Sequence, residues 1–219
     1  GRASWDDHER CGEQFRPRGA LRARRGPVAL RASVGQGWFA PTPFVEEIET
    51  AGLARLEPLS GLKAEIARTA SLDLSWVDGP WEAGLVLFGS DIEDAVQVQT
   101  VGPERVRLAN VHGVTRTRGV ETLLRWRQAP FVVTARYVYV AASGPDPDAT
   151  GRRRTPLTPR HSAGLVAVME DHDRGRIGFE AYYTGAQSLD DDPYRSDSEA
   201  YWELGMLGEV ALGRVRVFL

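Results

Sequence analysis

The side chains near the start of the sequence have the types that bind transition metals. The polar residues there supply oxygen, nitrogen and sulfur within one short stretch: Asp6, Asp7, His8, Glu9 and Cys11. A zinc site uses such ligands, but it normally draws a second group of them from elsewhere in the chain. No second group occurs at ligand spacing, so we expect a solvated polar segment here and no metal site.

A second cluster is acidic and could hold calcium, which prefers several carboxylate oxygens. Its members lie close together near the C-terminal end of the sequence: Asp190, Asp191, Asp192, Asp197 and Glu199. Their spacing matches no known calcium-binding loop. We therefore expect an exposed acidic loop.

Groups for nucleophilic catalysis and for phosphate binding are not arranged as those activities require. His112, His161 and His172 have no Gly-x-Ser-x-Gly nucleophile motif beside them. The stretch from Gly35 to Gly37 is followed by Trp-Phe-Ala-Pro instead of a helix start, so it is no phosphate-binding loop. The sequence predicts neither an enzyme nor a bound cofactor.

The composition fits one ordinary domain with no strongly charged partner. The chain has 219 residues and a formal net charge of -3, which does not suggest binding to nucleic acid. Cys11 is the only cysteine, so an internal disulfide is excluded. The first residues lack the basic-then-apolar order of a secretion signal, so we expect an exported protein with this sequence to be a fragment.

The hydrophobic pattern is that of β-strands. No run approaches the roughly 20 apolar residues of a membrane-spanning helix, whereas a membrane β-strand needs only about 9–11 residues with one apolar face. Apolar and polar residues alternate in about ten segments bounded by Gly, Pro and Asp. The alternation places four residues on polar faces opposite the apolar ones: Arg31, Gly119, Glu121 and Glu180.

Short and long connections alternate along the chain. Short turns are expected at residues 25–27, 77–80, 128–130, 171–175 and around Gly213. Long polar links are expected at residues 39–61, 99–113, 144–159 and 187–200. An antiparallel up-and-down meander with tight turns at one end and long loops at the other has this pattern, as do outer-membrane barrels.

Aromatic residues lie at or near the ends of the expected strands. They are Trp38, Phe39, Trp76, Trp81, Trp126, Phe131, Tyr137, Tyr139, Tyr183 and Trp202. Aromatic girdles at the two faces of a bilayer would have this distribution. Ordinary aromatic residues of a β-sheet core would have it as well, so this feature does not separate the two.

Residues 30–42 carry the most specific resemblance to a known family. Their sequence, Leu-Arg-Ala-Ser-Val-Gly-Gln-Gly-Trp-Phe-Ala-Pro-Thr, resembles a barrel signature of TonB-dependent receptors: arginine, glycine-x-glycine-aromatic, then alanine-proline. The family usually has arginine where Phe39 stands. Residues 59–65 resemble a later stretch, with Ala64 in place of the usual proline. Further similar segments are residues 15–21, 87–94, 117–121, 153–161 and 215–219.

This resemblance implies an all-β fold in which residues 1–219 are part of a 22-stranded transmembrane β-barrel. It implies about ten of those strands, without the N-terminal plug domain and the last strand. It also implies the outer membrane of a Gram-negative-type bacterium, with membrane lipid and the TonB energy-coupling complex as partners. The expected function is energised uptake of a scarce nutrient such as an iron-siderophore, haem, cobalamin or a sugar.

Ligand-binding residues of such a receptor should lie on loops and on the inner wall near the outer rim. Aromatic and cationic side chains could meet a ferric chelate there. The candidates are Trp38, Phe39, Tyr194 and Arg195.

Two alternatives remain open at this stage. A passive porin-like barrel would share the strand pattern, and a soluble all-β ligand-binding module would turn its apolar faces inward. Charged substitutions at Leu124, Phe179 or Leu204 would enter lipid in a membrane barrel and a dry core in a soluble module.

Overall fold

The structure is a computed structural model that describes residues 2–8, 12–42, 56–102, 105–146, 150–171, 174–189, 194–212 and 215–218. Within these ranges every regular element is a β-strand, and none of the residues forms a helix that could span a membrane. The expected all-β class is therefore confirmed.

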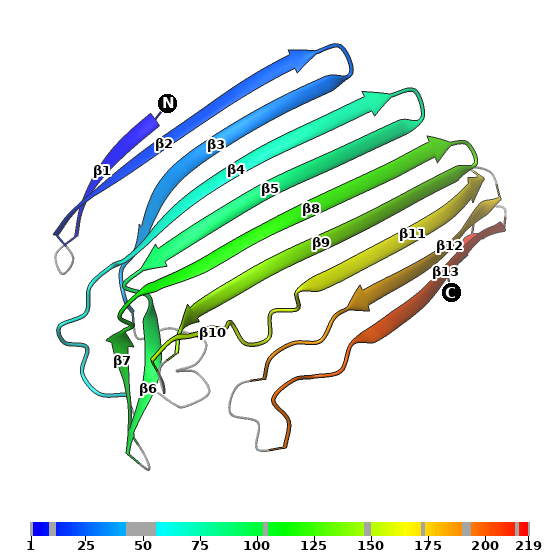
Figure 1. Cartoon of the computed structure of the whole chain (residues 1–219). Helices are drawn as coiled ribbons and strands as arrows, with labels where there is room; N and C mark the ends of the chain where they lie inside the picture. The colour runs from blue at the N-terminus through cyan, green and yellow to red at the C-terminus, as the bar shows by residue number, and fades with distance from the viewer. Residues whose placement is uncertain are drawn as a thin grey trace.

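The main sheet is an antiparallel meander (Figure 1). Its strands, in spatial order, are β1 (Arg2–His8), β2 (Gly12–Arg25), β3 (Val28–Phe39), β4 (Glu65–Asp78), β5 (Trp81–Glu93), β8 (Val114–Gln128), β9 (Phe131–Pro145), β11 (His161–Asp171), β12 (Gly175–Thr184), β13 (Tyr201–Leu212) and β14 (Val215–Phe218). The short strand β10 (Arg152–Arg154) pairs with β9.

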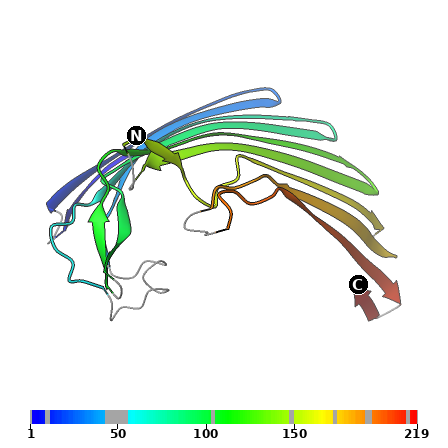
Figure 2. The same ribbon diagram turned by 60° about the horizontal axis from the view of Figure 1, so that its bottom comes forward.

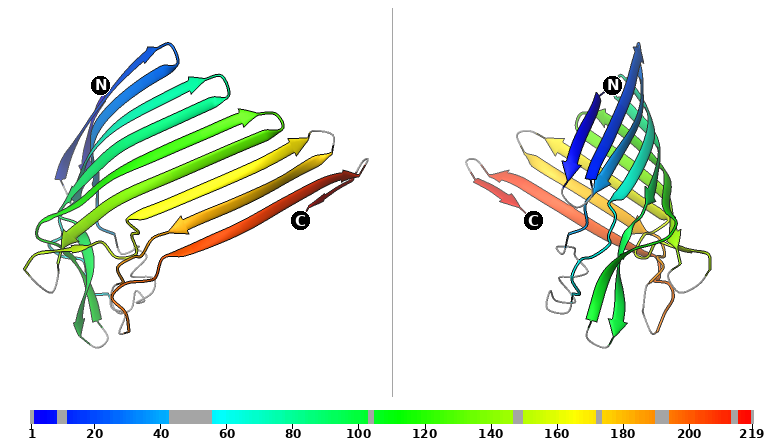
Figure 3. Two further views of the ribbon diagram at one scale, coloured as in Figure 1. Left: turned by 45° about the vertical axis from the view of Figure 1, so that its right-hand side comes forward. Right: turned by 90° about the vertical axis from the view of Figure 1, so that its left-hand side faces the viewer.

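Tight turns join the strands at one end of this sheet. Gly26 and Gly79 have positive φ values of 58° and 54° in the β2–β3 and β4–β5 turns, a conformation that glycine adopts without steric cost. The long connections lie at the opposite end (Figure 3). The alternation of connection lengths expected from the sequence is present in the described part of the chain.

One of the expected long links contains regular structure. Residues 99–113 were expected to be a polar loop, but β6 (Val96–Gly102) and β7 (Arg105–Asn110) form a separate two-stranded sheet there. Val98 pairs with Leu108, whose side chain is buried. Val96 and Val98 alternate with Gln97 and Gln99, so the strand signal is present but short, and the polar residues around it favoured a loop.

The segment near the N-terminus also differs from expectation. Residues 2–8 form β1, which pairs with β2 from Arg2 opposite Arg18 to His8 opposite Gly12. A polar strand gives no alternation signal, whereas its backbone can still complete the hydrogen-bond ladder of an edge. The expected loop is therefore wrong for residues 6–8, which form a strand, and Glu9 and Cys11 lie outside the described residues.

The cross-strand registers define two faces of the main sheet. The row across Leu30, Leu74 and Leu85 is mostly apolar, and its further members are Thr122, Tyr137, Ala163, Tyr183 and Trp202. The next row, on the other face, contains Arg22, Arg31, Asp73, Val86 and Glu121. The sheet therefore has one apolar face and one polar face.

The sheet is bent into an arc (Figure 2). Side chains on the convex side of an arc diverge, so they are more exposed than those on the concave side. The apolar face carries many of the exposed large side chains, among them Leu21, Leu74, Leu85, Leu124, Phe179 and Leu204. We therefore assign the apolar face to the convex side and the polar face to the concave side.

Neither face of the main sheet is covered by a second layer in the described part of the chain. The buried apolar residues there are only Ala64, Leu108 and Ala181. A soluble domain normally buries the apolar face of its sheet against another layer. The convex face thus has the exposure that a surface in contact with lipid would have.

Candidate functional site

The concave wall, defined as the polar face of β2 to β14, is the surface on which the sequence placed its polar candidates. Arg31 of β3 lies between Arg22 and Asp73 in one cross-strand row. Glu121 of β8 lies further along the same row, after Val86. Period-two alternation brings all of them to one side.

Ion pairs connect neighbouring strands along the middle of this wall. Arg136 of β9 donates to Glu121 at 2.9 Å. Arg125 lies 3.3 Å from Glu82 and also donates to Thr134. These side chains are partly exposed, so each pair adds little stability. Their main consequence is a hydrated, charged surface.

Gly119 leaves room for an aromatic ring on the wall. A Cβ at this position would overlap the end of the ring of Phe88, which extends from the adjacent strand β5. Phe88 lies directly opposite Gly119 in the register. The glycine therefore serves the packing of Phe88, and the ring forms an apolar patch within a polar surface.

Glu180, on β12, also lies against a glycine of the neighbouring strand. It lies opposite Gly205, where a Cβ would come within 3.0 Å of its side chain. Tyr182 donates a hydrogen bond from its hydroxyl to Glu180 at 3.1 Å. A small residue on β13 thus gives the carboxylate space to lie against the sheet.

The β2 to β4 part of the wall is cationic with a serine ladder beside it. Ser33 and Ser71 share a hydrogen bond of 2.8 Å, and Ser71 donates to Asp73 at 3.2 Å. Arg22 and Arg31 occupy adjacent positions on β2 and β3. This part of the wall can present guanidinium and hydroxyl donors to an anionic group.

A buried carboxylate holds the last two strand pairs together at the end with the tight turns. Glu209 of β13 is only 5% exposed. Arg176 of β12 approaches one of its oxygens at 2.8 Å, and Arg216 of β14 donates to the other. The carboxylate therefore joins three strands on the concave side.

We expect Glu209→Gln to lower the free energy of unfolding by about 1–3 kcal/mol, because a buried charged partner of two arginines is removed. Arg176 and Arg216 are about half exposed and can regain water, which keeps the loss moderate. The shift of the urea midpoint of the refolded barrel measures the effect. Glu203→Gln, on the same face of the same strand but exposed, is the control. Equal midpoints for the two variants would contradict the bridging role.

The four predicted ligand residues lie at the long-loop end of the sheet, in two groups. Trp38 and Phe39 end β3, and the Cζ of Arg16 lies 5.8 Å from the centroid of the Trp38 ring. Tyr194 is 90% exposed in the β12–β13 connection, and Arg195 lies 3.6 Å from Glu199. Several strands separate the two groups, so the described structure does not bring them into contact.

The metal-binding and acidic clusters named from the sequence lie partly outside the described residues. Among the residues whose positions the structure describes, no three His, Cys, Asp or Glu side chains are grouped to hold a metal ion. Asp190, Asp191 and Asp192 lie outside those residues, as does His172. Asp197 lies 3.9 Å from Arg154 of β10.

Sequence reasoning missed several residues of the wall, including Phe88, Asp73, Arg136 and Glu209. Their signal was the same alternation that selected Glu121 and Arg31. Three of them, Asp73, Phe88 and Arg136, lie opposite or beside predicted residues once the register is known. The register itself depends on pairing between strands and cannot be obtained from either strand alone.

An antiparallel meander with an apolar convex face, a polar concave face and long loops at one end is the architecture of a β-barrel wall. The chain belongs to the TonB-dependent receptor family, because the family model described as TonB dependent receptor-like, beta-barrel, matches residues 3–209. This family consists of outer-membrane receptors for transport, and the expected membership is confirmed.

Solved structures with the same fold include siderophore receptors. The siderophore receptor PirA from Acinetobacter baumannii superposes with a TM-score of 0.75 at 14% identity, covering 97% of this chain and 37% of that one. A mutant of the ferric enterobactin receptor PfeA from Pseudomonas aeruginosa, in complex with enterobactin, gives 0.74 at 16%, with 96% and 35% covered. The ferric-catecholate import receptor Fiu from E. coli gives 0.68 at 19%, with 93% and 29% covered.

This chain spans about a third of the length of those structures. At these identities the similarity shows the fold alone. A search of curated protein sequences finds no match. Nothing in the comparisons favours the porin-like barrel or the soluble module, and the count of 22 strands is not tested by this chain.

Proposed function

We propose that this chain is part of the wall of an outer-membrane receptor that takes up a ferric chelate with energy supplied through TonB. The observation that carries the proposal is the family match over residues 3–209, together with siderophore receptors among the structural neighbours. Residues 1–219 would then form a partial barrel domain, and the plug that contacts TonB would be supplied by the complete protein.

The two faces of the sheet support this function physically. A lipid-facing surface must be apolar, whereas a surface that lines a water-filled interior tolerates charges. Arg31, Glu121 and Glu180 lie on the concave wall, where an interior would be. Arginine and hydroxyl donors on that wall suit the oxygen-rich, anionic surface of many iron chelates.

The test is growth under iron limitation with single chelates as the iron source. We expect a strain that lacks the complete gene to fail on one chelate and to recover with the gene in trans, but not in a TonB-deficient background. Growth that is independent of TonB would indicate a passive porin. Equal growth of the deletion strain on every chelate would contradict iron uptake and direct the search to other nutrients.

Tyr194 and Arg195 are the loop residues whose removal should affect ligand capture first. We expect Tyr194→Ala combined with Arg195→Ala to weaken chelate binding about 10-fold, since stacking and cation–π contacts contribute roughly 0.5–1.5 kcal/mol each. Binding to whole cells with radioactive iron measures this. Tyr194→Phe and Arg195→Lys retain the ring and the charge and should stay near wild type. An unchanged affinity in the double alanine variant would remove this pair from the site, and Trp38 and Phe39 would be tested next.

A further inference from the structure

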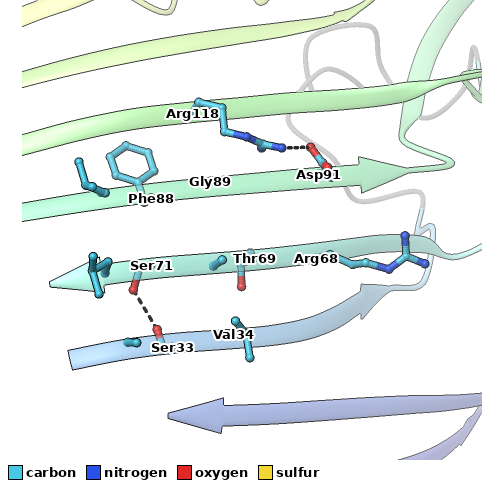
Figure 4. Close-up of a pocket in the computed structure, with 13 residues that line it drawn as sticks. Ser33, Val34, Arg68, Thr69, Ser71, Phe88, Gly89, Asp91 and Arg118 are labelled. Carbon is cyan, nitrogen blue, oxygen red and sulfur yellow. Dashed lines mark hydrogen bonds and ion pairs between the residues drawn. The ribbon is translucent and has the colours of Figure 1, made fainter. Parts of the chain in front are cut away.

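A hollow lies across β3, β4 and β5 (Figure 4). The register places most of its lining residues on the convex face, whereas Ser33, Thr69, Ser71 and Phe88 belong to the concave face. It has a volume of about 580 Å³, within the range of about 300–1,000 Å³ for ligand sites. The small residues Ala70 and Gly89 pair with each other and form its floor. Val34, Leu72 and Leu87 border it with apolar side chains.

The opposite rim of this hollow is charged. Arg68, Asp91 and Arg118 line it, and the register places all three on the same face as Leu72 and Leu87. Their side chains therefore point to the convex side, where charges are penalised unless they lie near the edge of the bilayer. A charged cluster on an otherwise apolar face is stable in a membrane only at a depth where the charges can reach water or headgroups.

The position of these charged residues along the strands gives their depth in the membrane. Arg68 and Arg118 are each eight residues from the tryptophans at the tight-turn end, Trp76 and Trp126. At about 3.3 Å per residue and a tilt of about 40°, this separation is roughly 20 Å in height. An outer-membrane barrel has an apolar band about 25 Å tall. The rim therefore lies about 5 Å inside the long-loop edge of this band, a distance from which a long arginine side chain can reach the headgroups.

The arginines are held in place by the sheet itself. Arg118 lies flat across Gly89, where a Cβ would come 2.9 Å from its Cδ. Its Nη2 donates to Asp91 at 2.8 Å, and its Nη1 donates to the backbone carbonyls of Ser90 and Thr117. This arrangement leaves the Arg118 side chain 54% exposed at the rim, and Figure 4 shows its ion pair with Asp91.

The cluster as a whole is cationic. Arg68 donates to Glu93 and Gln36, and Arg116 lies 3.9 Å from Asp91. Three arginines thus share two carboxylates, and each arginine side chain remains more than half exposed. Arginine binds phosphate with paired hydrogen bonds. A phosphate at this rim would satisfy the excess charge.

We propose that the hollow binds a phosphorylated, multiply acylated lipid of the leaflet that faces the long loops. The lipid phosphate would contact Arg68, Arg116 and Arg118, and an acyl chain would lie over Ala70 and Gly89 between Leu72 and Leu87. The proposal rests on the proposed outer-membrane location. It adds a lipid site on the outside of the barrel that is separate from the concave wall.

The test uses the receptor expressed from its complete gene and purified in nonionic detergent. Native mass spectrometry would count bound lipid A, a bis-phosphorylated acylated disaccharide, against the same lipid without phosphates. We expect the wild type to retain the phosphorylated form at least 10-fold better. We expect Arg68→Gln, Arg116→Gln and Arg118→Gln together to abolish this preference, and Asp91→Asn, which removes a competing carboxylate, to raise retention about threefold.

Matched variants separate the site from general effects. Ala70→Leu fills the floor without touching a charge and should lower retention several-fold. Arg25→Gln with Arg174→Gln, at the tight-turn end of the sheet, should stay within twofold of wild type. Equal retention of both lipids, no change in the triple arginine variant, displacement of lipid by inorganic phosphate, or a second protein copy in place of the lipid would each overturn the proposal.

Failure of the lipid site is distinguishable from failure of the proposed function. Fractionation and heat-modifiable electrophoretic mobility report whether the folded receptor is in the outer membrane. A receptor that is inserted and supports chelate-dependent growth, but shows no phosphate preference, would overturn the lipid site alone. A protein absent from the outer membrane would overturn both proposals.

Discussion

Replacing Leu85 by arginine should destabilise the folded barrel by about 2–4 kcal/mol, the cost of an arginine near the middle of the bilayer on the lipid-facing side. Leu85 lies on the convex face, between Leu74 and Thr122. It is four residues from Trp81, or roughly 10 Å above the aromatic residues at the tight turns. The urea midpoint of the barrel refolded into lipid vesicles measures the change.

Val86→Arg is the matched control, because it places the same charge one residue away on the other face. The register puts Val86 between Asp73 and Glu121 on the concave wall. An arginine there would gain carboxylate neighbours in water, so we expect a change of less than about 1 kcal/mol. If Val86→Arg were the more damaging of the two, the assignment of the faces would be reversed.

Replacing Gly175 by alanine should cost about 3 kcal/mol or more and disrupt the start of β12. Gly175 has a φ of 128°, which L side chains rarely adopt, and a Cβ would overlap the carbonyl oxygen of Glu209 on β13. Backbone atoms cannot move aside as a flexible side chain can, so strain and overpacking add. The fraction of chain with the mobility of the folded barrel in unheated gel samples is expected to fall sharply.

Gly37→Ala is the control for this substitution. Gly37 is also a strand glycine, but a Cβ there would meet no atom within 4 Å, and its φ is not in the left-handed region. We expect it to fold as the wild type does. Similar folded fractions for the two alanine variants would show that the close approach of β12 and β13 at Gly175 is not needed.

The main sheet could be predicted from the sequence because its strands are long and two-faced. The alternation of Val28, Leu30, Ala32 and Val34 with polar or small residues extends over several positions, and a one-residue slip would reverse every side chain. β1 could not be predicted in this way, because both of its faces carry polar residues. Valine alternates with glutamine in β6, but β6 and β7 have only 7 and 6 residues within a polar stretch, so the hairpin was expected as a loop.

The sequence predicted individual residues of the candidate site but not the contacts between them. Alternation places Glu121 on the polar face, but its partner Arg136 is on the next strand, and only the register joins them. Gly119 was expected to leave space, whereas the ring that uses this space belongs to Phe88. Trp38 and Phe39 end β3, whereas Tyr194 and Arg195 lie in a long connection, which carries no periodic signal that fixes its conformation. The role of all four in ligand binding stays a prediction.

The most direct test of the central claim is the accessibility of spin labels along β8 in the complete receptor, reconstituted in lipid without Cys11. Single cysteines from position 120 to position 125 would be labelled in turn. The account predicts that labels at 120, 122 and 124 collide with oxygen dissolved in lipid, and that labels at 121, 123 and 125 collide with a water-soluble nickel complex. Uniform exposure to nickel, or oxygen access at the odd positions, would contradict a barrel wall with its apolar convex face in the membrane.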